Sequence, residues 1–443
     1  MAKVFVLADD FTGALDTGVQ FSASGASVYV MVAAEGEPVS ISCHMPDSPD
    51  VLVVDTETRH MCPSAAARRV GALTREAARL GFTHFYKKTD SALRGNVGAE
   101  LCAMLDASGC GVLAFAPAYP KSGRVTIGGI HYVDGVPLGE SVFARDPHAP
   151  VAHSAVTDII GEQTDIAVVV CAADFCGCGS GGSGKGERKC KRERAIYIFD
   201  AESDGDLQKI GAYLKERDLL KCLAGCAGFA GALQDIYGIG AGDPVAAGNA
   251  GSADISVPDI LEESRSLLLV TGSVNPITLK QLSHAAKTGF RVIPLSPEQK
   301  LSPTPKMMAE TADAAARALR ECDRVIITAA TCQADVDKTD AYAREHHIPE
   351  GELRSRISKN IAQLAAATLK LQDIGALAVF GGDTLYEIIS QMGIKTISPI
   401  KEIAPGIVDA RIISTQKTPK LITKSGGLGS EDALADIVSY LYG

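Results

Sequence analysis

The stretch "LADDFTGALDTGVQF", Leu7–Phe21, joins the end of a short apolar run to a helical pattern through two adjacent aspartates. Phe11, Leu15 and Val19 recur every four residues, which is the spacing of a helix with one apolar face. Gly25 then provides a stop before a second apolar run begins. This order of strand, helix and strand predicts the first unit of an α/β domain.

The same alternation of short apolar runs and helical segments continues through most of the chain. We expect further strands in the first part at residues 51–55, 82–86, 112–117, 165–170 and 195–200, and in the second part at 267–273, 290–295, 324–330 and 376–382. Helical patterns lie between them, such as the one from Pro63 to about Leu80. Because such alternation is typical of parallel sheets covered by helices, the sequence predicts two α/β/α domains with largely parallel sheets.

Two segments interrupt this alternation. Residues 129–138 place Asp134 and Gly135 between two short strand-like runs, which predicts a hairpin. Residues 238–256 are rich in Gly and Ala without helical periodicity, so we place the domain boundary there. The predicted domains are residues 1–245 and 246–443.

The composition excludes several classes of protein. The chain has 443 residues and a net charge of −10, which argues against a broad nucleic-acid or membrane-binding surface because such surfaces need many Lys and Arg. The 12 cysteines are scattered and sparse for a disulfide scaffold, so we expect mostly reduced, buried thiols. The first apolar run is too short for a signal sequence and no uninterrupted apolar stretch reaches membrane-spanning length, which predicts a cytoplasmic protein.

The segment 176–194, "CGCGSGGSGKGERKCKRER", is the one low-complexity stretch. It contains the Gly-x4-Gly-Lys spacing of a phosphate-binding loop, but Gly186 stands where that motif needs Ser or Thr. The alternative of a flexible surface loop fits the charged residues that follow. A zinc site is also open, although the cysteines do not form two CxxC pairs; they are Cys171, Cys176, Cys178 and Cys190.

Polar residues follow three expected strands of the first domain. They are Asp9 and Asp10, the segment "DTETRH" at 55–60, and "KKTDSALRGN" at 87–96. Ligands of parallel α/β sheets bind at the carboxyl ends of strands, where these segments fall. One aspartate suffices to cap the following helix. The second is then available to hold a substrate hydroxyl, accept its proton or join a metal shell.

The segment 87–96 is read in two ways. Lys and Arg are usually exposed, so it is a solvated loop in the simpler interpretation. Its position between a strand and a helix also suits the binding of a small carboxylate, with Arg94 in the lining and Arg59 as a bidentate clamp. The segment "AYPKSGR" adds a fourth polar loop that contains Arg124.

The second domain has three glycine-rich turns after expected strands. They are "FGGDT" at 380–384, "TGS" at 271–273 and "KSGGLGS" at 424–430. Glycines at such turns let backbone N–H groups approach a phosphate, and a following helix N-terminus favours the negative charge. Three such loops suggest a nucleotide site, although glycine at each could simply end a strand.

The motifs "ADDFTGALDTG", "KKTDSALRGN", "PAYPKSGR", "AGCAGFAGAL", "GGDT" and "KSGGLG" together resemble the four-carbon acid sugar kinases, formerly the DUF1537 group. The resemblance runs in order from Val4 to the last helix. It implies an N-terminal acid-sugar-binding domain, a C-terminal ATP-binding domain and an active site in the cleft between them. It also implies phosphoryl transfer from Mg²⁺-ATP to the terminal (4-) hydroxyl of a tetronate.

Residue roles follow from this resemblance together with the polar loops. Asp10 and Asp9 are the catalytic candidates, one of them as general base. The substrate-binding candidates are Asp9, Asp10, Arg59, Lys87, Lys88, Thr89, Asp90, Arg94 and Arg124. The nucleotide-binding candidates are Ser273, Gly381, Gly382, Asp383, Thr384, Gly426 and Gly427. No dedicated metal motif is visible, so Mg²⁺ is expected only with ATP.

Several alternatives stay open. The stretch "DTGVQF" looks most like the threonate branch, which favours D-threonate over erythronate, 3-oxo-tetronate or another small hydroxy acid. A non-catalytic nucleotide-dependent sensor and a dehydrogenase are alternatives from other classes, but no strand leads into Gly-x-Gly-x-x-Gly with an acidic residue about 20 positions on. The segment "IAPGIVDARI" departs from the family pattern after Gly406, which puts the role of that loop in doubt. The sequence leaves a homo-oligomer open.

Overall fold

The computed structural model describes residues 3–32, 41, 48–146, 149–171, 194–239, 265–284, 289–425, 427 and 429–443. The chain divides into two compact units, Met1–Gly251 and Ser252–Gly443. The predicted boundary at residues 245 and 246 lies outside the described residues, as does segment 176–194 apart from Arg194.

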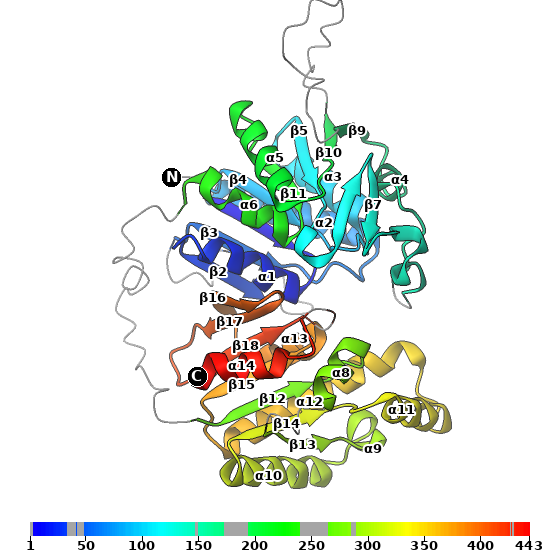
Figure 1. Ribbon diagram of the computed structural model, residues 1–443, viewed down its shortest axis with the longest axis vertical. Helices are drawn as coiled ribbons and strands as arrows, with labels where there is room; N and C mark the ends of the chain where they lie inside the picture. Colours follow the sequence, from blue (N-terminus) through cyan, green and yellow to red (C-terminus); the bar gives the residue numbers. More distant parts are fainter. Residues whose placement is uncertain are drawn as a thin grey trace, which may run out of the picture. The chain divides into compact units, whose positions relative to one another are not determined.

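The N-terminal unit is built on one parallel sheet with the strand order β2-β3-β1-β4-β11-β5-β10-β9 (Figure 1). Its strands are β1 (Val4–Ala8), β2 (Val28–Val32), β3 (Val51–Asp55), β4 (His84–Lys88), β5 (Val112–Ala116), β9 (Ala167–Cys171), β10 (Ala195–Phe199) and β11 (Cys222–Gly225). Its α-helices are α1 (Phe11–Ser22), α2 (Pro63–Arg79), α3 (Val97–Ser108), α4 (Val156–Gly161), α5 (Asp204–Glu216) and α6 (Ala227–Tyr237).

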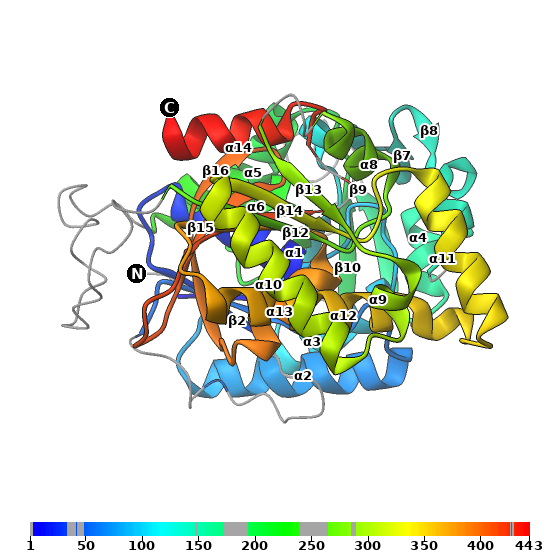
Figure 2. The ribbon, with the colours of Figure 1, turned by 90° about the horizontal axis from the view of Figure 1, so that it is seen from below.

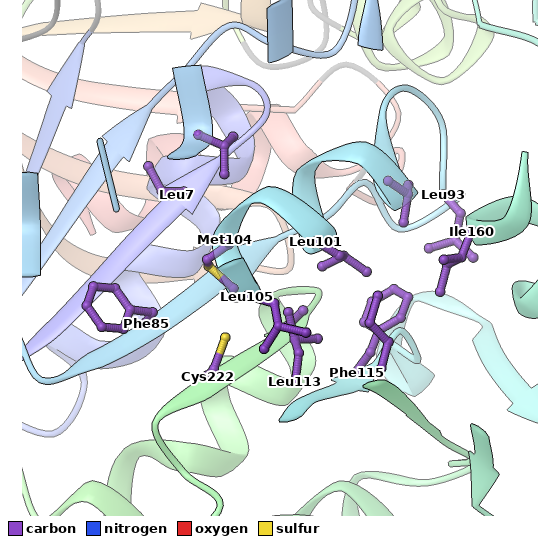
Figure 3. Close-up of a cluster of buried hydrophobic side chains, with 14 of the residues drawn as sticks. Leu7, Phe85, Leu93, Leu101, Met104, Leu105, Leu113, Phe115, Ile160 and Cys222 are labelled. Carbon is purple, nitrogen blue, oxygen red and sulfur yellow. The ribbon is translucent and has the colours of Figure 1, made fainter. Parts of the chain in front are cut away.

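Helices cover both faces of this sheet. Helices α2 and α3 pack together on one face, and α1, α5 and α6 form a layer on the other (Figure 2). Strand β1 is buried along its whole length, which explains its unbroken apolar run. Leu101 and Leu105 of α3 and Leu113 of β5 belong to the buried hydrophobic cluster that Figure 3 shows.

A separate three-stranded antiparallel sheet confirms the predicted hairpin. Its strands are β6 (Arg124–Ile127), β7 (Ile130–Val133) and β8 (Val136–Pro137). Asp134 and Gly135, both with positive φ, form the turn between β7 and β8. A short 3₁₀-helix, η4 (Val142–Arg145), follows.

The C-terminal unit has the strand order β13-β14-β12-β15-β18-β17-β16. Strands β12 (Leu267–Thr271), β13 (Arg291–Pro294), β14 (Arg324–Thr328), β15 (Ala376–Phe380) and β18 (Lys420–Lys424) are parallel, whereas β16 (Thr396–Ala404) and β17 (Ile407–Ile412) add an antiparallel hairpin. Its described helices are α8 (Pro276–Ser283), α9 (Pro297–Leu301), α10 (Pro305–Glu321), α11 (Gln333–Glu345), α12 (Glu350–Leu371), α13 (Gly382–Gln391) and α14 (Ala433–Tyr442).

The structure corrects three expectations. Lys87 and Lys88 belong to strand β4 instead of the loop after it, because both ammonium groups have buried oxygen partners. The segment "IAPGIVDARI" contains the end of β16, the turn of the β16–β17 hairpin and the whole of β17, with Gly406 at φ +75°. Among the described cysteines only Cys222 and Cys226 are buried, so the thiols are not mostly core residues, although all the described ones are free.

Within the described residues, no helix is both long enough and apolar enough to cross a bilayer.

Candidate active site

The carboxyl ends of three neighbouring strands gather the charged residues of the N-terminal unit. Strand β1 lies between β3 and β4, and Ala8 pairs with both Asp55 and Lys88. Because the three strands are parallel and end in register, the residues that follow them meet at one edge of the sheet. The polar segments that begin at Asp9, Asp55 and Lys88 therefore form one site, which we call the acidic-edge site.

Arg59 is the centre of the acidic-edge site. Its Nε lies 2.7 Å from Asp9 Oδ2, its Nη1 lies 2.6 Å from Asp10 Oδ2, and its Nη2 lies 3.5 Å from Asp90 Oδ1. The Arg59 side chain is only 11% exposed. Burial would lower the pKa of the guanidinium, but Asp10 and then Asp9 outweigh it and raise that pKa well above its ordinary value. Arg59 thus clamps aspartates, and its role as a clamp on a substrate carboxylate stays a prediction.

Asp90 and Arg94 form a second pair beside Arg59. Arg94 Nε lies 2.7 Å from Asp90 Oδ2, its Nη2 lies 3.0 Å from Asp90 Oδ1, and its Nη1 lies 3.0 Å from Oδ2 of Asp146. Burial would raise the pKa of Asp90, but Arg94 and then Arg59 hold it far below its usual range. Asp90 is therefore a permanent carboxylate that positions both arginines.

The two adjacent aspartates have different surroundings. Asp10 is the N-cap of α1: its Oδ1 accepts a hydrogen bond from the Gly13 N–H at 2.9 Å, and its Oδ2 accepts from Thr12 Oγ1 at 3.2 Å as well as from Arg59. Burial would raise the pKa of Asp10, but Arg59 and then Lys88 lower it below its usual value. Asp9 is 3% exposed, and within the described residues its Oδ1 has no hydrogen-bond donor. Asp9 therefore keeps one carboxylate oxygen available.

The two lysines of β4 point to opposite faces of the sheet, as alternate strand residues do. Lys87 is fully buried, and its Nζ lies 2.9 Å from Glu100 Oε2, so it serves the core under α3. Lys88 Nζ donates to the Thr89 carbonyl oxygen at 2.9 Å and lies beside the aspartates. Burial would lower the pKa of Lys88, but Asp9 is the first of the groups that outweigh it and raise that pKa. Of the two, only Lys88 joins the acidic-edge site.

Gly13 keeps Asp10 and Lys88 close together. A Cβ at this position would lie 2.5 Å from Asp10 Oδ1 and 2.9 Å from Lys88 Nζ. No side chain fits there without moving one of these two groups. The glycine after the two aspartates is therefore part of the site geometry.

The hairpin sheet brings Arg124 to the side of Arg94. The two guanidinium carbons lie 5.2 Å (Arg94) and 5.9 Å (Arg124) from the centre of the Phe143 ring. His131 ties this sheet to the site, because its Nε2 lies 3.0 Å from the Ser91 carbonyl oxygen. Burial lowers the pKa of His131 to about 4, so this imidazole is neutral at pH 7.

Asp55 is a further residue of the acidic-edge site. It begins the segment "DTETRH" but was not among the predicted site residues. It is fully buried at the end of β3, and its Oδ1 accepts a hydrogen bond from the Glu57 N–H at 3.1 Å. Burial, followed by the charge of Glu57, raises the pKa of Asp55 well above its ordinary value. Glu57 itself has a φ of +45°, which is strained for a residue with a side chain.

The three glycine-rich turns of the C-terminal unit also lie at one edge. Strand β15 lies between β12 and β18, with Thr271 paired to Phe380 and Phe380 paired to Lys424. The Gly272 N–H donates to Thr384 Oγ1 at 3.1 Å, and the Gly381 N–H donates to the Lys424 carbonyl oxygen at 2.9 Å. These contacts join the three turns into one surface, which we call the glycine edge.

Backbone conformation explains the glycines of this edge. Gly381 has a φ of +103°, which side chains rarely allow, and it precedes Gly382, the first residue of α13. Ser273 Oγ accepts a hydrogen bond from the Asn275 N–H at 3.3 Å, so the predicted serine orders the turn after β12. Gly427 lies near Asn275, and Gly426 lies outside the described residues. The N–H groups of the first turn of α13 suit a phosphate.

Two charged residues, Asp383 and Lys424, lie at the glycine edge. Asp383 pairs with Arg354 of α12, so this predicted residue has a basic partner. Lys424 begins the turn "KSGGLGS" and was not among the predicted nucleotide-binding residues. It is buried, with its Nζ 2.8 Å from the Ser425 carbonyl oxygen and 4.9 Å from the centre of the Phe380 ring. Burial lowers the pKa of Lys424 to about 7. The signal available in the sequence is a lysine between a short apolar run and a glycine-rich turn.

Comparison with protein families defines the class of this chain. Residues 4–233 match the model of a sugar-binding N-terminal domain, and residues 268–434 match that of a nucleotide-binding C-terminal domain. The acidic edge and the glycine edge fall in the first and the second match respectively. The chain is therefore a two-domain sugar- and nucleotide-binding protein. It belongs to the four-carbon acid sugar kinase family.

Curated relatives match nearly the whole chain. A D-threonate kinase of Salmonella typhimurium is 29% identical over 99% of this chain and 98% of its own length. A D-erythronate kinase of Heliobacterium modesticaldum is 28% identical over 100% and 97%. A 3-oxo-tetronate kinase of Burkholderia multivorans is 27% identical over 96% and 94%.

Solved structures agree with the fold. The crystal structure of a protein from Salmonella typhimurium LT2 matches with a TM-score of 0.78 at 20% identity, covering 99% of both chains. That of the Haemophilus influenzae protein HI1011, of the DUF1537 family, matches with a TM-score of 0.70 at 19% identity, covering 99% of this chain and all of that one. At these identities the likeness concerns the fold alone.

Proposed function

We propose that this protein is an ATP-dependent kinase that phosphorylates the terminal (4-) hydroxyl of a four-carbon acid sugar, with D-threonate as the preferred substrate. The family assignment and the kinases among the relatives support the reaction class. The observation that carries the site is Asp9, whose buried Oδ1 has no donor among the described residues. A buried carboxylate oxygen without a donor is costly, and a substrate hydroxyl would satisfy it.

The roles proposed at the acidic edge follow from the contacts. Asp9 accepts the hydroxyl proton as the hydroxyl oxygen attacks the γ-phosphorus of ATP, and the bond from that phosphorus to the β–γ bridging oxygen breaks so that ADP leaves. Asp10 holds the start of α1 and, through Arg59, keeps Asp9 in place. Lys88 balances the negative charge beside Asp9. Arg94 and Arg124, whose guanidinium groups both lie near the Phe143 ring, are the candidates to bind the substrate carboxylate.

The glycine edge is proposed to hold the phosphates of ATP. Backbone N–H groups at Gly382, Asp383 and Thr384 open helix α13, and Lys424 adds a cation. Phosphoryl transfer depends mostly on positioning and charge neutralisation, which suits such a surface.

The residues present fit a magnesium ion that arrives with ATP. Mg²⁺ keeps several waters and needs only one or two protein carboxylates besides the phosphates. Asp383, 40% exposed in the first turn of α13, is the carboxylate that would hold it. The ion would supply charge neutralisation on the transferred group. No cluster of three or more metal-binding side chains occurs in the described part of the chain.

The identity of the acid substrate is the most specific part of the proposal. The relatives are named for D-threonate, D-erythronate and 3-oxo-tetronate, so erythronate and 3-oxo-tetronate are the alternatives. The cytoplasmic location and a homo-oligomer stay predictions from the sequence.

The test is ADP release by the purified protein with Mg²⁺-ATP and a panel of acids. The panel contains both enantiomers of threonate and of erythronate, 3-oxo-tetronate and glycerate. We expect the highest kcat/KM with D-threonate. A higher value with another tetronate would correct the substrate, and no turnover of any acid would contradict the proposed function.

A further inference from the structure

Two cysteines lie together at the amino ends of strands β5 and β11, in a part of the N-terminal unit that the proposed reaction does not use. Cys110 stands in the turn between α3 and β5, and Cys222 is the first residue of β11. The two thiols share a hydrogen bond. We propose that Cys110 and Cys222 form a redox-modification site, where hydrogen peroxide or another hydroperoxide converts the two thiols into a disulfide that a dithiol reductant opens again.

The fold brings these two cysteines together although they are far apart in the sequence. Strand β11 pairs with β5 in parallel, so the two strands begin at the same edge of the sheet. Gly109 ends α3 in the left-handed conformation, with φ +70°, and turns the chain toward the start of β5. Ser108 Oγ lies 3.6 Å from Cys222 Sγ and accepts a hydrogen bond from the Cys110 N–H at 3.3 Å. The end of α3 therefore holds both cysteines in place.

The two thiols differ in exposure and in charge. Cys222 is 1% exposed and belongs to the buried hydrophobic cluster that Figure 3 shows, whereas Cys110 is partly exposed. The hydrogen bond from Cys222 lowers the pKa of Cys110 to about 6; burial opposes this shift, and Ser108 and Lys221 reinforce it. The same hydrogen bond, followed by burial, raises the pKa of Cys222 well above its ordinary value. At pH 7 the pair therefore consists of an accessible thiolate, the form that attacks peroxides, and a buried thiol.

The oxidation takes place in two steps. The Cys110 thiolate attacks one oxygen of the peroxide, the O–O bond breaks, hydroxide leaves, and the sulfur becomes a sulfenic acid. The negative charge on Cys110, one of the causes that raise the pKa of Cys222, is then gone. Cys222 gives its proton to the hydroxide and attacks the Cys110 sulfur, so that an S–S bond forms, the S–O bond breaks, and the second oxygen leaves as water after it takes up a proton. The two sulfurs give up two electrons, which reduce the peroxide to water.

The disulfide acts on stability and lies away from the proposed sugar site. The acidic edge is formed by the carboxyl ends of β1, β3 and β4, whereas the two cysteines stand at the amino ends of β5 and β11. The bond closes a long loop that contains the hairpin sheet, β9 and β10. A cross-link that closes a long loop restricts the unfolded chain and therefore stabilises the folded one.

The test treats the reduced full-length protein with a small molar excess of hydrogen peroxide, alkylates the remaining thiols, and maps disulfides by mass spectrometry of non-reduced peptides. It compares the unaltered protein with Cys110→Ser and Cys222→Ala, and with the control Cys102→Ser, whose thiol contacts Arg194 Nη2 at 3.0 Å. We expect a Cys110–Cys222 link in the unaltered protein and in the control, and its reversal by dithiothreitol. Thermal unfolding of the oxidised unaltered protein should have a midpoint roughly 5–15 °C above that of the reduced protein.

Three results would overturn the inference. They are the absence of any disulfide in the unaltered protein, oxidation of Cys110 to a sulfinic acid without a link to Cys222, and a disulfide between other cysteines in place of this one. The decisive measurement is made on the unaltered protein, so it does not depend on the folding of Cys222→Ala, and Cys110→Ser changes a partly exposed side chain. A Cys110–Cys222 link without a shift of the unfolding midpoint would support the modification site and contradict its effect on stability.

Discussion

The candidate binding sites at the carboxyl ends of the strands are built from different groups in the two units. The acidic edge of the N-terminal unit is built from ionised side chains, with Arg59 bound to Asp9, Asp10 and Asp90. The glycine edge of the C-terminal unit is built mainly from backbone, with turns whose glycines leave room for N–H groups. Side chains that recognise hydroxyls and a carboxylate must be held at fixed angles, whereas phosphate oxygens accept from any converging N–H groups.

This difference predicts different weak points. At the acidic edge, removal of one charge leaves its partners buried and unpaired, so fold and activity should suffer together. At the glycine edge, an added side chain should disturb nucleotide binding while the rest of the unit stays folded. Each prediction below tests one side of this comparison.

The largest effect is expected from Arg59→Met. The substitution leaves Asp9, Asp10 and Asp90 without their shared partner in a buried site. Removal of one member of a buried ion pair costs about 3–5 kcal/mol, so the free energy of unfolding should fall by that amount. Denaturant unfolding followed by circular dichroism measures it, and kcat with D-threonate should fall below detection.

Arg291→Met is the matched control. Arg291 pairs with Glu321, but both side chains are more than half exposed. Such surface pairs contribute about 0–1 kcal/mol. Equal losses of stability in the two variants would show that Arg59 is not a buried organising cation.

A medium effect is expected from Gly381→Ala. With φ at +103°, a side chain at this position is strained, at a cost on the order of 1–3 kcal/mol, and its Cβ would lie 3.4 Å from Ser273 Cβ. Steady-state kinetics should show a KM for ATP raised about tenfold or more, with the KM for the acid unchanged.

Gly393→Ala separates backbone strain from nucleotide binding. Gly393 also has a positive φ, +67°, but a Cβ there would meet nothing within 4 Å. This variant should lose some stability and keep its KM for ATP. A raised KM for ATP in Gly393→Ala as well would mean that strain in general, and not the turn at Gly381, weakens nucleotide binding.

The smallest effect is a pH dependence that comes from Lys424. Burial lowers the pKa of Lys424 to about 7, so the free protein loses this positive charge as the pH rises through 7. Bound phosphates favour the charged form, and the KM for ATP should therefore rise severalfold between pH 7 and 9. Lys424→Met should have a higher KM for ATP at pH 7 and a flatter profile. A flat profile in the unaltered protein would remove Lys424 from the nucleotide site.

The same shift has a consequence for stability. The pKa of Lys424 is lowered on folding from its ordinary 10.5 to about 7, so the unfolded chain binds more protons than the folded chain between these two pH values. The contribution of this group to stability should therefore increase as the pH rises through that window.

Much of the fold was predictable because strands of parallel sheets are buried on both faces. For this reason β1 and β3 can be recognised in the sequence as unbroken apolar runs. Strand β4 was placed two residues early because Lys87 and Lys88 break the apolar pattern, and only tertiary partners such as Glu100 make them acceptable in a strand. Strand β11, Cys222–Gly225, is short and made mostly of small residues, so its sequence carries little strand signal.

The candidate site was predictable as a set of residues but not as a set of contacts. Parallel strand order explains why Asp9, Arg59 and Asp90 meet. Which aspartate caps the helix depends on the backbone at Asp10, and which lysine reaches the site depends on where β4 ends. The pairing of Arg59 with three carboxylates could not be read from the sequence, because any of the nearby acids was an equal partner.

The most direct test of the account compares Asp9→Asn with the unaltered protein, measuring kcat for D-threonate and, separately, the affinity for an ATP analogue that cannot be hydrolysed. Asparagine keeps the size of the side chain and removes its ability to take a proton. We predict that kcat falls by about 10²–10⁴-fold while the affinity for the analogue stays within a factor of two. Two results would contradict the assignment of the acidic edge to the sugar and the glycine edge to the nucleotide. One is an unchanged kcat, and the other is a fall in kcat that is accompanied by a loss of nucleotide affinity.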